Sequence, residues 1–168
     1  MPSLKLLSWN MNQKANNWQV VLGSGVDIAL LQEAKAPPVD LADKFMIQQD
    51  LEATVSKLPW RAIVAGLDNS GKFEFVPIKT QPLGGNDPEA LMVSRPGTLD
   101  AAIVRIKETG EEITVVSLYS TWMNPIKQTR SSWIFADGSA HRLVSDLSGL
   151  IGSQKGHKII AAGDLNIL

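Results

Sequence analysis

Near its C-terminal end the chain reads Ile159-Ile160-Ala161-Ala162-Gly163-Asp164-Leu165-Asn166. The apolar residues at its start predict a buried strand, and Gly163 lets the backbone turn tightly where that strand ends. Asp164 and Asn166 stand two apart, so an extended backbone would point both side chains to the same side. A carboxylate that accepts a proton from water, beside a carboxamide that donates to a developing phosphate charge, suits phosphoester hydrolysis. A strand followed by an Asx turn explains the same residues without any chemistry, so both interpretations stay open.

The composition is that of a globular protein with one domain over residues 1–168. Of its 168 residues, 44% are hydrophobic and 20% are charged, and the net charge of −1 gives no support for tight, charge-driven nucleic-acid binding. The absence of cysteine excludes disulfides, thiolate metal sites and cysteine nucleophiles. There is no signal-peptide pattern and no apolar run long enough to span a membrane, so we expect a soluble, cytoplasmic protein.

Two apolar strands near the N-terminus predict a βαβ unit. Residues 4–9 are dense in apolar residues on both faces, which predicts a central strand, and residues 28–31 are apolar throughout. Helical spacing over 14–22 connects the two. Asn10 and Glu33 follow the carboxyl ends of these strands, where open α/β sheets place their ligands. Asn10 alone is explained equally by a turn. A carboxylate directly after a buried strand is either salt-bridged or holds a metal, and with Asn10 and Asp164 reaching the same edge we favour the metal.

The middle of the chain predicts further strands and one long loop. We expect a helix over 40–57, a hairpin pairing 60–65 with 73–76, and a surface loop without catalytic residues over 77–89. Short turns then predict antiparallel neighbours among three strands, at 90–94, 101–106 and 113–118.

The last of these strands ends at the only tyrosine of the chain, Tyr119, whose hydroxyl either reaches a ligand or is the tip of a core residue. A polar loop at 122–137 carries Arg130 among aromatic residues. That mixture is typical of single-strand nucleic-acid binding and equally of a loop anchored by its aromatics. A strongly periodic helix is expected over 140–151. His141 and His157 lack acidic sequence neighbours and are read as solvated residues at element ends.

Four segments in order carry a family resemblance: Ser8-Trp9-Asn10-Met11-Asn12, Leu30-Leu31-Gln32-Glu33, Ser117-Leu118-Tyr119 and Gly163-Asp164-Leu165-Asn166. On these segments the sequence resembles the endonuclease/exonuclease/phosphatase superfamily, the deoxyribonuclease-like metal-dependent phosphoesterases. The resemblance implies an α/β (α+β) fold, the amino-terminal half of a four-layer α/β/β/α sandwich in which a mixed sheet carries helices on its outer face. It also implies hydrolysis of phosphodiester or phosphomonoester bonds.

The resemblance further implies roles for individual residues. Mg²⁺ or Mn²⁺ would be held by Glu33 with Asn10 beside it, and the oxygen ligands suit such hard cations. Asp164 would take the proton from the attacking water, while Asn166 and Tyr119 would steady the phosphate. Two further positions, Asn12 and Arg130, are expected to bind substrate. DNA, RNA, a phosphoinositide and a small phosphoester all remain candidate substrates.

The sequence also departs from the family. Family members carry a second half after the Gly-Asp-x-Asn strand, with another Asp/Asn pair and a Ser-Asp-His segment, and neither His141 nor His157 occupies the place of that histidine. We therefore expect a domain truncated after this strand, hydrolysing nothing alone and self-associating through an uncovered sheet face. The alternative function is an inactive fragment that acts as a binding module or has no function. A nucleotide-binding domain is disfavoured because no glycine-rich loop follows the first strand.

Overall fold

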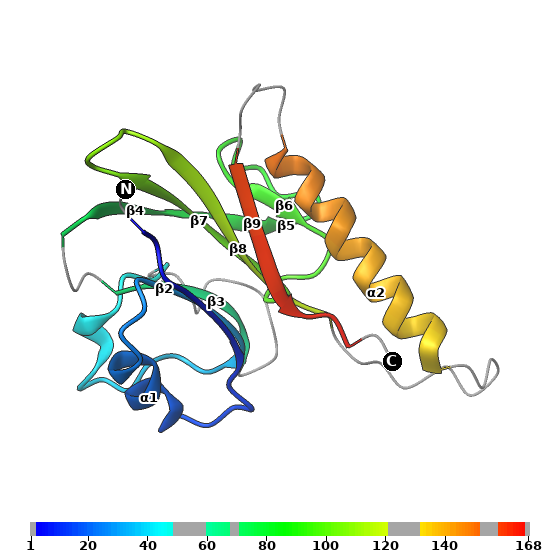
Figure 1. Ribbon diagram of the computed structural model, residues 1–168. Helices are drawn as coiled ribbons and strands as arrows, with labels where there is room; N and C mark the ends of the chain where they lie inside the picture. Colours follow the sequence, from blue (N-terminus) through cyan, green and yellow to red (C-terminus); the bar gives the residue numbers. More distant parts are fainter. Residues whose placement is uncertain (1–2, 49–59, 68–70, 121–131, 152–157, 167–168) are drawn as a thin grey trace.

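The computed structural model describes residues 3–48, 60–67, 71–120, 132–151 and 158–166, with the backbone alone at 132–138. Two mixed sheets form its centre, and Figure 1 shows the two helices on opposite sides of the molecule. Sheet A contains β1 (Leu6–Asn10), β2 (Ile28–Ala34) and β3 (Arg61–Gly66). Sheet B contains β4 (Phe73–Ile78), β7 (Leu99–Ile106), β8 (Glu112–Tyr119) and β9 (Lys158–Asp164), in that order.

The N-terminal βαβ unit is confirmed. Strands β1 and β2 pair in parallel from Leu6 opposite Ile28 to Asn10 opposite Gln32, with α1 (Asn17–Gly23) between them in sequence. The carboxyl ends of both strands therefore lie at one edge of sheet A, as the sequence predicted. The apolar strand expected at 60–65 forms nearly as predicted, as β3, and it runs antiparallel to β2.

Sheet B brings the second group of predicted residues to the same end of the molecule. Strands β7 and β8 form the expected antiparallel pair, and β9 runs parallel to β8. That register places Asp164 directly opposite Tyr119. The last residues of two strands that are far apart in sequence thus become neighbours.

The two sheets pack face to face, and one helix packs on the outer face of each. The layer between the sheets is made of fully buried side chains, among them Leu30 and Val64 from sheet A and Val104 and Val115 from sheet B. On the outer face of sheet A, Trp18 of α1 is completely buried and meets Phe45 edge-to-face at 4.7 Å. The outer face of sheet B is covered by α2 (Ser132–Leu147), with a 3₁₀ turn, η2 (Ser148–Leu150), at its end.

The expectation of an uncovered sheet face was wrong for these strands. The family resemblance implied one mixed sheet, with helices on its outer face, for these strands. They instead form the two separate sheets, whose apolar inner faces cover each other. Strands that are apolar on both faces fit a sandwich as well as a single central sheet, so periodicity alone does not separate the two arrangements.

Three local expectations were also wrong. The segment expected as the start of a helix over 40–57 holds only a 3₁₀ turn, η1 (Ala42–Lys44), before Phe45 becomes extended; residues 49–59 lie outside the described part. Strand β4 pairs with β7 in sheet B and not with the 60–65 strand. The strand expected at 90–94 is β6 (Leu91–Val93), and it pairs in parallel with β5 (Thr80–Pro82) in a small sheet of their own. Pairing partners distant in sequence carry no local signal.

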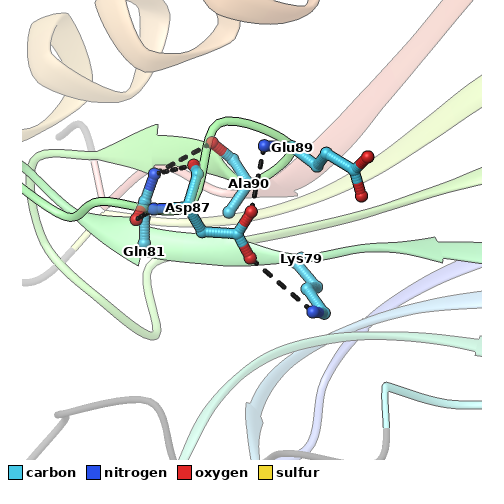
Figure 2. A network of polar contacts seen from close by, with 5 residues as sticks. All are labelled: Lys79, Gln81, Asp87, Glu89 and Ala90. Atoms are coloured by element: carbon cyan, nitrogen blue, oxygen red, sulfur yellow. Dashed lines mark hydrogen bonds and ion pairs between the residues drawn. The ribbon is translucent and has the colours of Figure 1, made fainter.

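The loop between β5 and β6 is closed by one buried side chain, Gln81 (Figure 2). Its Nε2 donates to the carbonyl oxygens of Asp87 at 2.6 Å and Ala90 at 3.3 Å, and its Oε1 accepts the Asp87 N–H at 3.0 Å. The Asp87 carboxylate also accepts the Glu89 N–H and lies 3.6 Å from Lys79 Nζ. The surface loop expected over 77–89 is therefore only partly a loop: its first residues belong to β4 and β5, and the rest is an ordered connection.

Among the described residues, no helix has the length and apolar character needed to cross a bilayer.

Candidate active site

The predicted site residues meet where strands of both sheets end. Asn10 closes β1 and Glu33 lies near the end of β2, so these two come from sheet A. Tyr119 closes β8 and Asp164 closes β9, so these two come from sheet B. We call the first pair half-site A and the second pair, with Asn166, half-site B. Since β1 packs against β9 in the sandwich, the two half-sites face each other.

Glu33 leaves its strand through a bulge. The pairing of β2 with β3 shifts register between Leu31 and Ala34, and Glu33 has a left-handed backbone with φ of 47°. The turn after β1 supports this conformation, because Met11 N–H donates to the Gln32 carbonyl oxygen and Gln13 N–H donates to that of Glu33. A left-handed non-glycine residue costs on the order of 1–3 kcal/mol and persists where its surroundings hold it.

All four described non-glycine residues with positive φ lie at this end of the sandwich. They are Asn12, Gln13, Glu33 and Asn166. Strained backbone of this kind gathers at ligand sites, where it aims side chains that a regular strand would misdirect. This left-handed backbone could not be predicted from residue type: asparagine tolerates the region, but glutamate and glutamine do not favour it.

Asn10 joins the two half-sites. Its Nδ2 donates to Asp164 Oδ2 at 2.8 Å and to Glu33 Oε1 at 3.2 Å, while its Oδ1 accepts the Asn12 N–H at 2.8 Å. The amide thus bridges two carboxylates that would otherwise repel each other. It follows that Asn10 reaches a metal through oxygen only after its amide rotates by half a turn.

Asp164 is held by two donors and by the close approach of its strand. Its Oδ2 accepts from Asn10 and its Oδ1 accepts the Asn166 N–H at 3.0 Å. A Cβ on Gly163 would overlap the Leu118 carbonyl oxygen, so only glycine lets β9 lie this close to β8. The backbone expected to be extended turns instead at Asn166, where φ is 48°. The Asn166 Nδ2 donates to the Ser120 carbonyl oxygen at 2.6 Å. The Asx turn and the site geometry therefore coexist.

Tyr119 is a buried core residue, and its hydroxyl also reaches the site. The two roles that the sequence left open for Tyr119, a core residue and a site residue, are therefore both present. The phenol donates to Glu33 Oε1 at 3.3 Å, and Trp60 meets the ring edge-to-face at 5.4 Å. Burial, with the negative charges of Glu33 and Asp164, raises the pKa of Tyr119 to about 12, while Arg95 acts in the opposite direction. Tyr119 therefore keeps its proton throughout the neutral range and stays a hydrogen-bond donor.

The donor set fits a hard divalent cation that keeps most of its water. Among the described residues, no three His, Cys, Asp or Glu side chains gather closely enough to enclose an ion. Mg²⁺ nevertheless binds through one or two carboxylates, with waters and substrate oxygens as its other ligands. Glu33 and Asp164, bridged by Asn10, offer such a pair.

The remaining candidates divide as follows. Asn12 is exposed beside the site, with its N–H on Asn10. Arg130 and His157 lie outside the described residues, and His141 is exposed on α2. Sequence reasoning missed Trp60 and Arg95, which it treated only as strand and turn residues. Neither has a local signal, because only the tertiary structure brings the Trp60 ring onto Tyr119 and the charge of Arg95 near enough to act on it.

Comparison with known proteins finds the same fold in solved structures. No family model and no curated protein sequence matches. The endonuclease domain of TRAS1, a telomere-specific non-LTR retrotransposon, superposes with a TM-score of 0.59 at 18% identity, over 97% of this chain and 60% of that one. A mannosyl-6-phosphatase from Bacteroides thetaiotaomicron gives 0.61 at 16%, over 98% and 66%. An endonuclease/exonuclease/phosphatase family protein from the same organism gives 0.60 at 15%, over 99% and 65%.

These similarities confirm the family resemblance at the level of the fold. The chain has the mixed α+β fold of endonuclease/exonuclease/phosphatase proteins, and its structural neighbours include nucleases and phosphatases. It spans less than two thirds of the length of each of these neighbours.

Proposed function

We propose that the residues around Asn10 form a metal-dependent phosphoesterase site. The observation that carries the proposal is a set of contacts between strands of two different sheets: the Asn10 amide binds both Glu33 and Asp164, and the Tyr119 hydroxyl binds Glu33. The fold shared with nucleases and phosphatases supports it. The whole protein's substrate is part of the proposal: a phosphodiester, which includes nucleic acid, or a phosphomonoester.

In this proposal each residue has a defined task. Glu33, with Asn10 beside it, would hold Mg²⁺ or Mn²⁺, which would supply charge neutralisation at the phosphate. Asp164 accepts a proton from the attacking water, whose oxygen bonds to phosphorus as the ester P–O bond breaks. The bond's electron pair leaves with the ester oxygen, which takes up a proton from water to give the alcohol. Tyr119 and Asn166 donate hydrogen bonds to the phosphoryl oxygens, which the protonated phenol can do at neutral pH. Asn12 and Arg130 are proposed to contact the substrate.

The metal is tested by calorimetric titration of the 168-residue chain with Mn²⁺. We expect binding that Glu33→Ala abolishes, because Glu33 is the carboxylate that the β2 bulge aims into the site. Glu108→Gln is the matched control, since Glu108 is an exposed carboxyl in the β7–β8 turn. No binding by the unchanged chain, or equal binding by Glu33→Ala, would overturn the proposal.

The roles of the residues are tested by hydrolysis. With Mg²⁺ or Mn²⁺, plasmid DNA, RNA, a phosphoinositide and p-nitrophenyl phosphate cover the candidate substrates. Where hydrolysis is observed, Asp164→Asn should reduce kcat by roughly 10²–10⁴-fold and leave KM nearly unchanged. A variant that loses metal affinity instead would make Asp164 a ligand. Metal binding without any hydrolysis would favour the alternative of a catalytically silent binding module.

We also propose that copies of the chain associate. The face expected to drive association is buried, but β1 and β9 are edge strands whose outer sides have no partner strand among the described residues. Unpaired strand edges are templates for pairing with another chain. The cytoplasmic location expected from the sequence stays a prediction.

A further inference from the structure

A buried polar cross-link joins the two sheets directly behind the site. Ser117 Oγ, in β8, donates to the Leu31 carbonyl oxygen of β2 at 2.7 Å. Gln32 Nε2, in β2, donates to Ser117 Oγ at 3.1 Å and to the Leu30 carbonyl oxygen at 2.9 Å. Both side chains are almost inaccessible, with Ser117 at 0% and Gln32 at 2% exposure. The apolar layer between the sheets is thus interrupted by a hydrogen-bonded pair.

The cross-link is attached to both half-sites through the chain. Gln32 immediately precedes Glu33, and its backbone lies in the bulge between Leu31 and Ala34. The Leu31 carbonyl that Ser117 binds is the last regular position of β2 before that bulge. On the other sheet, Ser117 lies two residues before Tyr119 and pairs with Ala162, two residues before Asp164.

The direct contacts between the half-sites are few. They are the bond from Asn10 to Asp164 at 2.8 Å and the longer one from Tyr119 to Glu33 at 3.3 Å. Both involve side chains at the end of the sandwich, where water competes for them. By contrast, the cross-link is dry, and hydrogen bonds in a dry interior are stronger and more costly to leave unmade.

We propose that Gln32 and Ser117 are positioning residues that set the spacing between Glu33 on sheet A and Tyr119 and Asp164 on sheet B. Apolar contacts between sheets are non-directional and tolerate sliding, whereas a serine hydroxyl bound to one particular carbonyl does not. The pair therefore fixes the register of the two sheets at the point where the site needs it. This role rests on the proposed metal-dependent function, because it concerns the same carboxylates.

The test uses the full chain and two readouts. The first is Mn²⁺ affinity by calorimetry. The second needs no metal: the ¹³C resonance of Tyr119 Cζ, which responds to the hydrogen bond of the phenol and is unambiguous because the chain has one tyrosine. In Ser117→Ala, we expect Mn²⁺ affinity to fall by about 10-fold or more, as for other residues that orient metal ligands. We also expect the Cζ resonance to move.

Ser94→Ala is the matched control. It removes a hydroxyl that donates to Asp146 Oδ2 at 2.8 Å, a contact between the end of β6 and α2 on the other side of sheet B. It should lower the thermal midpoint without changing either readout. If Ser117→Ala does not fold, Gln32→Met carries the test, since it keeps a similar volume and removes the other donor of the cross-link.

The outcomes separate the two proposals. Unchanged affinity and an unchanged Cζ resonance in a folded Ser117→Ala or Gln32→Met would overturn the positioning role and leave the phosphoesterase proposal intact. If the unchanged chain binds no Mn²⁺, the phosphoesterase proposal fails, and a Cζ resonance that still moves in the variants and not in Ser94→Ala supports the positioning of Tyr119. If the Cζ resonance also moved in Ser94→Ala, the effect would not be specific to the cross-link, and the inference would be overturned.

Discussion

The two flanks of the sandwich differ in how their edge strands are hydrogen-bonded. On one flank, alternate backbone N–H groups of the edge strand β3 donate hydrogen bonds away from the sheet. On the opposite flank, the edge strands have no such partners among the described residues. Ala62 N–H donates to the Gly97 carbonyl oxygen, Val64 N–H to the Asp100 carboxylate and Gly66 N–H to the Met46 carbonyl oxygen. We call this the closed flank. The open flank consists of β1 and β9, which pack on each other across the two sheets.

The edge strands of sheet B differ in the same way. On the closed flank, β4 carries Pro77, which has no N–H to offer, and exposed charge at Glu74, which pairs with Arg105 at 2.7 Å. On the open flank, the centre of β9 is apolar, and its lysine at position 158 is engaged with Glu111. Natural proteins blunt exposed edges with proline and charge, so the closed flank needs no partner and the open flank remains available for one.

The largest effect is expected from pH, acting on the closed flank. Burial raises the pKa of Asp100 to about 7 from its ordinary value near 3.8, against the Val64 N–H and the charge of Arg61. Because the folded state holds this proton more tightly than the unfolded one, stability is fully present below about pH 4 and is lost as pH rises through 7. At about 1.4 kcal/mol per pKa unit, the loss is at most about 4 kcal/mol.

Denaturant unfolding between pH 4 and 8 measures this loss. In Asp100→Asn the free energy of unfolding should vary less over that range, since the amide does not titrate there yet still offers an oxygen to Val64. Glu108→Gln, at an exposed turn position, should leave the slope as it is. If the free energy of unfolding varied with pH equally in the unchanged chain and in Asp100→Asn, Asp100 would not be the source of the pH dependence.

A smaller effect is expected from Gly163→Ala, on the open flank. The added Cβ would overlap the Leu118 carbonyl oxygen, and backbone cannot give way as a side-chain tip does. Overpacking of this kind costs typically 1–3 kcal/mol. Since Asp164 follows directly, Mn²⁺ affinity should fall together with stability in thermal unfolding. Retained affinity would show that β9 shifts without moving the site.

Self-association should respond to charge on the open edge more than on the closed one. Ile160 on β9 is 36% exposed and Val76 on β4 is 39% exposed, so the two positions form a matched pair. Ile160→Lys should weaken association in sedimentation velocity, and Val76→Lys should not. Equal effects of the two substitutions would mean that the flanks do not differ in this respect, and a monomer at all concentrations would contradict association itself.

The smallest effect is expected from opening the closed edge. Pro77→Thr gives β4 an outward N–H without altering its pairing with β7, because a proline nitrogen within a paired strand faces away from its neighbour. Association should rise slightly in the same sedimentation assay, by less than Ile160→Lys lowers it. A decrease would show that Pro77 stabilises an interface instead of blocking one.

Several features followed from the sequence alone. Apolar runs bounded by glycine and asparagine located β1, β2, β7, β8 and β9. Strands β2, β7 and β8 are largely buried, as such runs predict. Strands β1 and β9 were expected to be central and buried, but they are edge strands with partly exposed residues. Polar residues directly after such runs marked Asn10, Glu33, Tyr119 and Asp164 as neighbours. The parallel pairs β1–β2 and β8–β9 made that inference sound, since parallel strands end at the same edge.

Other features were decided by tertiary structure. The division of the strands into two sheets, the pairing of β4 with β7 and the separate β5–β6 sheet depend on contacts between distant segments, which leave no periodic mark. The left-handed backbone of Glu33 is imposed by the bulge and the turn after β1, against the preference of the residue itself. Residue type and local pattern thus determined which side chains stand at strand ends. Only the packing of one sheet on the other decided how far apart those side chains are held. That distance is set by buried groups such as Ser117, which in the sequence is simply one serine in an apolar strand.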